Sequence, residues 1–136
     1  MGIIYRFWAG AILEEERKRG AKTGRFYALF FITFCQGFNL ASILFFSKII
    51  FKHNFKLFIS VDFFNGKILN GALSGFITLI APFLIINYFL VFWNNRYFDY
   101  LKKYPSENSK IYNMYFILSL LVFLIPLLFG FLISRI

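Results

Sequence analysis

The chain has 136 residues, of which 60% are hydrophobic and 15% are charged. A typical soluble domain has about 25% charged residues, so this composition excludes an ordinary soluble globular protein. The formal net charge is +9, but the basic residues flank apolar stretches, and no separate basic domain is left to bind nucleic acid.

Three stretches, residues 26–46, 71–93 and 112–133, contain neither a charged residue nor the single histidine. Each has roughly 20 residues, the length that a helix needs to cross the hydrocarbon core of a bilayer. The sequence therefore predicts an all-α, polytopic membrane protein with three transmembrane helices. Because the remaining segments are too short to bury cores of their own, we expect one membrane domain over residues 1–136.

Residues 1–20 have the pattern of an amphipathic helix. Two acidic residues each stand four residues before a basic one, in the pairs Glu14–Lys18 and Glu15–Arg19, and this order stabilises a helix. The apolar residues recur at spacings of one, three and four. They are Ile3, Ile4, Phe7, Trp8, Ala11 and Ile12.

This N-terminal helix is expected to end at Gly20. One interpretation places it on the cytoplasmic membrane surface or on a partner, with Trp8 and Arg17 at the membrane interface. The other interpretation is that it folds back on the protein's own bundle.

The first stretch carries a band of polar side chains spaced three residues apart, which keeps them on one side of the helix. Because amides in lipid need hydrogen-bond partners, we expect Gln36 and Asn39 to face another helix. Gly37 and Ala41 would let that helix approach closely. The alternative is a polar lining for a pore or a substrate. The band consists of Thr33, Gln36, Asn39 and Ser42.

The connector over residues 47–70 is apolar but too charged to span a membrane, which predicts an interfacial or re-entrant segment. Lys48, Lys52 and Lys56 repeat every four residues and would form one stripe on a helix. We expect these lysines to reach the lipid headgroups at the membrane interface, with an anion-attracting rim as the alternative. His53 has no second candidate ligand nearby and is expected to be a surface residue.

The second stretch opens with Gly71 and Gly75, a small-residue spacing that favours close helix packing. Asn87 adds a polar group that is expected to contact another helix. Pro82 predicts a kink. Trp93 ends the stretch and is expected at the membrane interface.

The connector over residues 94–111 is expected to continue the second helix until Pro105 stops it. Its aromatic face, Tyr97, Tyr100, Leu101 and Tyr104, would lie at the interface or on the N-terminal helix. The third stretch is nearly all Phe, Leu and Ile, which is typical of a lipid-facing helix. Pro126 predicts a kink in it.

The positions of Lys and Arg predict the orientation. Residues 1–25 contain six and the second connector four, which gives ten on one side. The first connector contains four and the C-terminal end has Arg135, which gives five on the other. We therefore expect a cytoplasmic N-terminus and a C-terminus on the opposite side.

The sequence contains no recognisable set of catalytic residues, metal ligands or cofactor-binding residues. No carboxylate lies in an apolar stretch, and the only cysteine, Cys35, lies in the first stretch, where a buried side chain is expected. His53 lies outside the stretches, so a nucleophile–base pair is not expected. We expect a protein that is not an enzyme and has no cofactor.

The expected role is that of an accessory or assembly subunit that contacts other membrane proteins, or copies of itself, in the bilayer. A homo-oligomeric channel or pore-forming effector and an immunity-type membrane protein are the alternatives. The predicted helix contacts are Gln36, Gly37, Asn39, Ala41, Gly71, Gly75 and Asn87. The predicted membrane-interface residues are Trp8, Arg17, Lys48, Lys52, Lys56 and Trp93.

In general character, the chain with its 22 phenylalanines resembles the small Phe-rich inner-membrane proteins of AT-rich bacteria. This resemblance is one of style and carries no functional residue with it. It implies a location in a bacterial inner (plasma) membrane.

Overall fold

A computed structural model describes residues 2–51, 58–106 and 109–133 of the chain. This described part is helical and contains no strand. The α-helices are α1 (Gly2–Arg19), α2 (Ala21–Phe51), α3 (Lys67–Gly75), α4 (Ala81–Asn87), α5 (Tyr97–Lys103) and α6 (Lys110–Ile133). Two π-helical turns, η1 (Phe76–Ile80) and η2 (Tyr88–Phe92), and a 3₁₀ turn, η3 (Trp93–Asn95), complete the second long helical unit.

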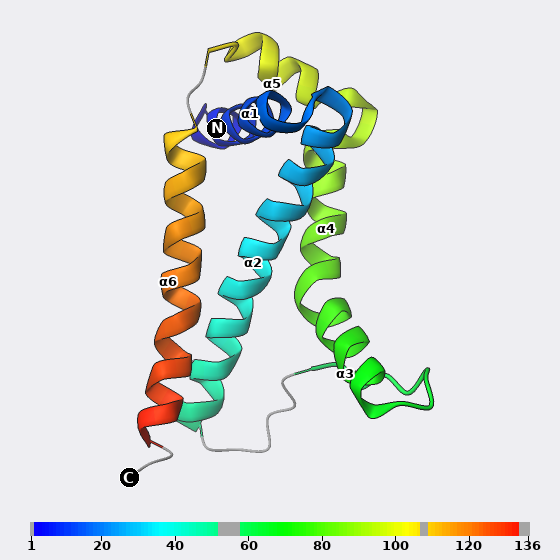
Figure 1. Cartoon of the computed structure of the whole chain (residues 1–136), viewed down its shortest axis with the longest axis vertical. Helices are drawn as coiled ribbons and strands as arrows, with labels where there is room; N and C mark the ends of the chain where they lie inside the picture. Colours follow the sequence, from blue (N-terminus) through cyan, green and yellow to red (C-terminus); the bar gives the residue numbers. More distant parts are fainter. Residues whose placement is uncertain (1, 52–57, 107–108, 134–136) are drawn as a thin grey trace.

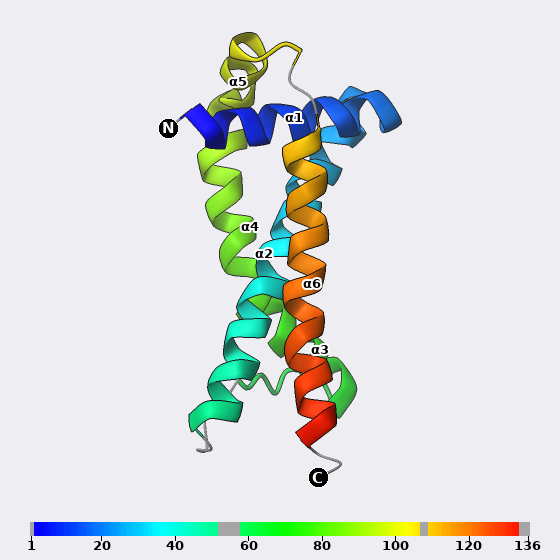
Figure 2. The same cartoon turned by 90° about the vertical axis from the view of Figure 1, so that its left-hand side faces the viewer.

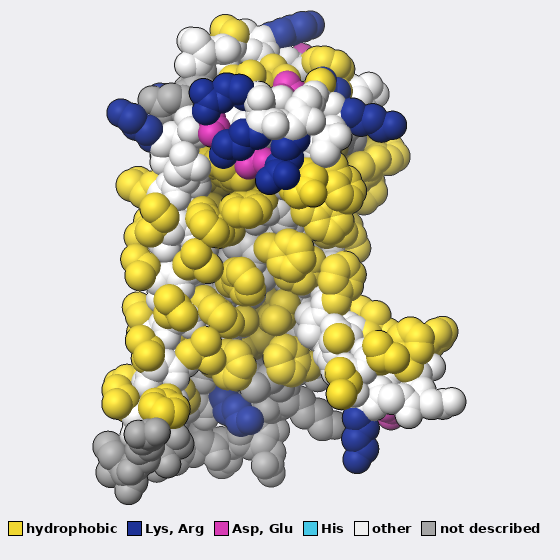
Figure 3. All heavy atoms as spheres, viewed as in Figure 1, with side chains coloured by type: hydrophobic (Ala, Val, Ile, Leu, Met, Phe, Trp, Pro, Cys, Tyr) yellow, Lys and Arg dark blue, Asp and Glu magenta, His cyan; other side chains and the backbone are white. Residues whose placement is uncertain are grey.

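Within the described residues, three helical units are long and apolar enough to cross a membrane, namely Ala21–Ile50, Lys67–Asn95 and Lys110–Leu132. This finding confirms the prediction of an all-α chain with three membrane-length helices. The three units run along one long axis, and the beginning of α1 and the end of α6 lie at opposite ends of the molecule (Figure 1). Charged side chains gather towards both ends of the visible face, and a broad apolar band lies between them (Figure 3).

Helix α1 lies across one end of the bundle, over the end of α6 (Figure 2). The middle of α1 is buried against the protein's own helices, and because five consecutive residues are buried there, the expected amphipathic face stays a prediction. This packing agrees with the interpretation that the N-terminal helix folds back on the protein's own bundle. A helix that lies on the membrane surface stays a prediction. The buried residues of α1 are Trp8, Ala9, Gly10, Ala11, Ile12 and Glu15.

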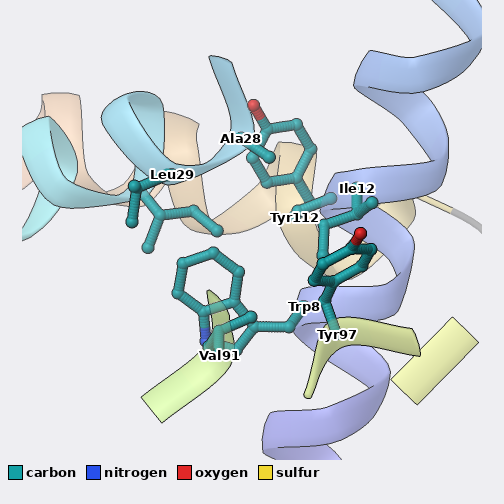
Figure 4. Packing of buried hydrophobic residues seen from close by; sticks show 9 residues of the cluster. Trp8, Ile12, Ala28, Leu29, Val91, Tyr97 and Tyr112 are labelled. Atoms are coloured by element: carbon teal, nitrogen blue, oxygen red, sulfur yellow. The ribbon is translucent and has the colours of Figure 1, made fainter. Parts of the chain in front are cut away.

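A cluster of buried hydrophobic residues lies where α1 crosses the bundle (Figure 4). Trp8 and Ile12 of α1 pack there against Leu29 of α2, Val91 of η2 and Tyr112 of α6. Farther along the spans, most apolar side chains are exposed. Within the most apolar 18-residue segment, the buried share is 39% in the first span, 17% in the second and 11% in the third. Helix α2 is therefore the central helix, and the other two spans present most of their surface outwards.

The second span leaves regular α-helical geometry in the π-helical turn η1, directly before α4, whose second residue is Pro82. Proline has no backbone N–H and its ring collides with the preceding turn, so the local hydrogen bonding must change. Helix α6, in contrast, continues through Pro126.

The second span does not continue into the second connector, and that expectation is wrong. Asn94 and Asn95 have φ angles of 55° and 58°, in the left-handed region. Asparagine tolerates this region better than most residues, and two such residues in succession end the helix. The chain then turns, and α5 lies beside α1 at the same end of the molecule (Figure 1).

Candidate helix-contact site

The crossing of α1 and α2 depends on glycine at two positions. Gly20 ends α1 with a φ of +83°, a conformation that other residues rarely adopt. Four residues later, Gly24 lies against the backbone of α1, where a Cβ atom would stand 2.4 Å from the Glu16 nitrogen. Because backbone atoms cannot move aside as a side chain can, only glycine permits this close crossing.

An arginine joins three helices at this end. Arg25 of α2 donates from Nε to Glu16 Oε1 of α1 at 2.5 Å, and from Nη1 to the Tyr97 hydroxyl of α5 at 2.7 Å. The guanidinium carbon also lies 4.6 Å from the centre of the Tyr97 ring. Sequence reasoning missed this three-residue contact, because Arg25 and Tyr97 lie 72 positions apart.

Both acidic–basic pairs predicted on α1 are present. Glu15 is 7% exposed and accepts hydrogen bonds from Arg19 Nε at 3.0 Å and from the Tyr112 hydroxyl of α6 at 3.2 Å. Lys18 lies 2.9 Å from Glu14, and its hydrogen bond is the main cause that holds the pKa of the Glu14 carboxyl below its usual value. The carboxylates of α1 are therefore partnered at the end of the bundle.

Within the spans, Asn87 of α4 contacts the polar band of α2. Its Nδ2 donates to Gln36 Oε1 at 2.6 Å and to Thr33 Oγ1 at 3.1 Å. Thr33 is fully buried and donates in turn to the Leu29 carbonyl of its own helix at 2.7 Å. The structure thus brings together Gln36 and Asn87, two of the predicted contact residues.

Asn39 belongs to the same band but faces α6. Its Nδ2 lies 3.3 Å from the Tyr115 hydroxyl and 3.3 Å from Ser119 Oγ. Its buried Oδ1 has no hydrogen-bond partner within the described ranges. Ser42, 1% exposed, donates to the Phe38 carbonyl of its own helix. The band on α2 is thus divided between two neighbouring helices.

Gly37 and Ala41 lie against other parts of the chain. A Cβ at Gly37 would stand 2.6 Å from Ile80 Cδ1 and 3.0 Å from the Leu79 carbonyl oxygen, so η1 approaches α2 closely here. Ala41 is 3% exposed.

Gly71 and Gly75 have a different environment. Among the residues that the structure describes, no heavy atom comes within 4 Å of a Cβ built at either position. The neighbouring Ser74 is buried instead, and its hydroxyl donates to the Ile59 carbonyl of the first connector. The glycine side of α3 is therefore not covered by the described part of this chain.

The residues predicted to lie at the membrane interface differ in their exposure. Trp8 is buried in the hydrophobic cluster, at 5% exposure, and is not on the outer surface. Arg17 is exposed and lies 2.7 Å from Glu14. Lys48 is exposed in the last turn of α2, and Trp93 is exposed in η3. Lys52 and Lys56, like His53, lie outside the described residues.

A groove of about 510 Å³ lies between α4–η2 and α6, below the N-terminal half of α1. Figure 2 shows α4 and α6, with part of α2 visible between them. Gln36 and Asn87 contribute polar atoms to the groove, as does Tyr115 of α6. The rest of its lining is apolar and includes Phe7, Trp8, Phe83, Ile86, Leu90 and Ile111.

A second pocket, of about 430 Å³, adjoins this groove at the end of the span. It is lined by residues of α1, α5 and the turn between η3 and α5. Tyr100 lines this pocket, and its hydroxyl donates to the Leu90 carbonyl in the groove wall at 2.9 Å. Burial raises the pKa of Tyr100, which keeps the phenol neutral. The lining residues are Tyr5, Arg96, Asp99, Tyr100 and Lys103.

Within residues 2–51, 58–106 and 109–133, no group of three or more His, Cys, Asp or Glu residues could hold a metal ion. Comparisons with protein-family models, with curated proteins and with solved structures find no match to this chain.

Proposed function

We propose that the protein is a non-enzymatic subunit of a membrane complex, which it joins by helix contacts within the bilayer. The observation that carries this proposal is the open glycine side of α3. Gly71 and Gly75 stand one helical turn apart, and the described chain leaves the space above both unfilled. Small residues at this spacing let two helix backbones approach closely, which is a principal source of helix association in lipid.

The environment of the other small-residue pair supports this interpretation. Gly37 is already in close contact with η1 of the same chain. The chain therefore uses one such pair for its own packing and leaves the pair on α3 for a partner. The low burial of the second span, 17% of its apolar window, is consistent with a partner on this side.

A pore formed by copies of this chain is less well supported. The pore alternative needs the polar band of α2 as its lining. Thr33 and Ser42 are buried inside the chain, and Gln36 and Asn39 are hydrogen-bonded to other helices of the same chain. Exposing this band to a water-filled channel would require those contacts to break.

We also propose that the α1 end faces the cytoplasm of a bacterial inner membrane. Helices α1 and α5 lie at one end of the molecule, and the end of α6 lies at the other (Figure 1). The end with α1 and α5 therefore collects the larger share of Lys and Arg, which favours the cytoplasmic side.

The double variant Gly71→Leu/Gly75→Leu tests the proposed helix contact. Leucine side chains at these positions meet open space within the described chain, so they should leave its own fold intact. They would block a partner helix and reduce the mass of the complex extracted in mild detergent. Gly130→Leu is the matched control, because the space around Gly130 of α6 is equally open. A complex of unchanged mass in the double variant would contradict the proposal.

A further inference from the structure

We propose that the groove below α1 and the pocket that adjoins it bind one anionic glycerophospholipid. An acyl chain would occupy the groove, and the phosphate group would lie at Arg96 and Lys103. This inference goes beyond the proposed function, because it concerns a lipid site formed within a single chain.

The position of the groove favours an acyl chain as its occupant. Two of its walls belong to membrane-length helices, since residues 83–90 lie in the second span and residues 111–115 in the third. Ile86 and Leu90 are 51% and 56% exposed, so the groove can be entered from outside. In a bilayer, the surrounding medium at this depth is hydrocarbon, and water does not fill a largely apolar cavity. The volume of about 510 Å³ lies within the range of ligand pockets, roughly 300–1,000 Å³.

The adjoining pocket supplies the charge that selects an anionic headgroup. Arg96 directly follows the end of the second span, where lipid phosphates lie. Lys103 comes from the end of α5, and its Nζ lies 5.7 Å from the centre of the Tyr5 ring. Asp99 offsets one of these two positive charges, and the formal charge of the pocket lining stays positive. Basic pockets beside membrane helices are known to bind anionic headgroups.

The two cavities are neighbours, because residues that line one contact or directly follow residues that line the other. The Tyr100 hydroxyl in the basic pocket donates to the Leu90 carbonyl in the groove wall. On α1, Ile4 lines the groove and its neighbour Tyr5 lines the basic pocket. One molecule with a polar head and an apolar chain therefore fits the pair better than two separate ligands.

Fluorescence of Trp8, which lines the groove, can report an acyl chain within it. The other tryptophan, Trp93, is 50% exposed, so a Trp93→Phe background removes its signal. This chain would be reconstituted in phosphatidylcholine vesicles with increasing mole fractions of brominated phosphatidylglycerol or brominated phosphatidylcholine. Bromine on the acyl chain quenches tryptophan on contact. We expect brominated phosphatidylglycerol to quench half of the emission at a mole fraction about fivefold or more below that needed with brominated phosphatidylcholine. This factor corresponds to the binding energy that one basic residue contributes near a membrane surface.

In the double variant Arg96→Gln/Lys103→Gln, the anionic and the zwitterionic lipid should reach half-quenching at the same mole fraction. Its matched control is Lys48→Gln/Lys67→Gln, which removes two exposed charges at the opposite end of the molecule and should leave the preference unchanged. Ile86→Phe should reduce quenching by narrowing the groove, whereas Ile117→Phe on the exposed surface of α6 should not. Equal quenching by both lipids, or a preference that survives in Arg96→Gln/Lys103→Gln, would overturn the proposal. The assay needs no partner protein, so its failure would leave the proposed helix contact untouched.

Discussion

Asn87 Nδ2 lies 2.6 Å from Gln36 Oε1, and this hydrogen bond joins the second span to the first. The same nitrogen also donates to Thr33 Oγ1 at 3.1 Å. In lipid, an interhelical hydrogen bond contributes about 0.6 kcal/mol on average. Asn87→Leu removes both bonds and should lower the free energy of unfolding by about 1 kcal/mol. Reversible unfolding in mixed micelles measures this change.

Gln36→Leu is the control for that prediction, because it removes only one of the two acceptors of Asn87. It should lower the unfolding free energy by less than Asn87→Leu does. An Asn87→Leu protein as stable as the unchanged chain would show that this contact does not hold α4 to α2.

Gly24→Ala should destabilise the crossing of α1 and α2. The added methyl group would stand 2.4 Å from the Glu16 nitrogen, so the helix backbones must separate. Overpacking of this kind costs about 1–3 kcal/mol. The emission of Trp8, which is buried at this crossing, should shift as the cluster loosens. Gly71→Ala makes the same change in open space and should leave the emission unaltered.

Gly37→Ala should weaken the contact between α2 and η1, because its Cβ would lie 2.6 Å from Ile80 Cδ1. Ile80→Val removes that Cδ1 atom and should restore part of the stability lost in Gly37→Ala. The Leu79 carbonyl oxygen, 3.0 Å away, would keep the restoration incomplete. A double-mutant cycle of unfolding free energies measures this coupling. If the two substitutions were simply additive, the close approach would be contradicted.

Cys35 should react slowly with maleimides in the folded protein, since its side chain is 2% exposed. In denaturing detergent, the same thiol should react rapidly. The ratio of the two labelling rates, measured by mass spectrometry, tests whether α2 is the central helix. A Phe34→Cys variant in a Cys35→Ala background is the control, because Phe34 is 42% exposed on the same helix. Equal labelling of both positions in the folded state would contradict the packing.

Cells that produce the protein should keep their membrane potential. The polar side chains of α2 are engaged with α4 and α6, so the folded chain presents no continuous polar surface from this band. A potential-sensitive dye measures the effect of expression. A leak that appears with the protein and disappears in Asn39→Leu would favour the pore alternative instead.

The hydropathy of the sequence was sufficient to predict the three membrane-length helices. The length and apolar composition of each helix depend on the thickness of the bilayer and not on a particular neighbouring helix. It could not indicate which helix faces which. The same small-residue spacing occurs at Gly37/Ala41 and at Gly71/Gly75, yet only the first pair is packed within the described chain. Nothing local distinguishes them, since the difference depends on the distant η1.

Features formed between distant segments were harder to predict. Arg25 meets Tyr97 and Asn39 meets Ser119 across 72 and 80 positions, and neither pair has a local signal. The end of the second helix did have a signal. Asn94 and Asn95 form a pair of residues that tolerate left-handed backbone, but their place between a long apolar stretch and an aromatic helical pattern favoured a continuous helix.

The most direct test of the central claim is the mass and composition of the complex extracted from native membranes in mild detergent. Membership of a larger assembly predicts a defined complex with other membrane proteins, and this complex should be lost in Gly71→Leu/Gly75→Leu and retained in Gly130→Leu. A chain that elutes alone, or a closed ring of identical chains, would contradict the account of this protein as a subunit.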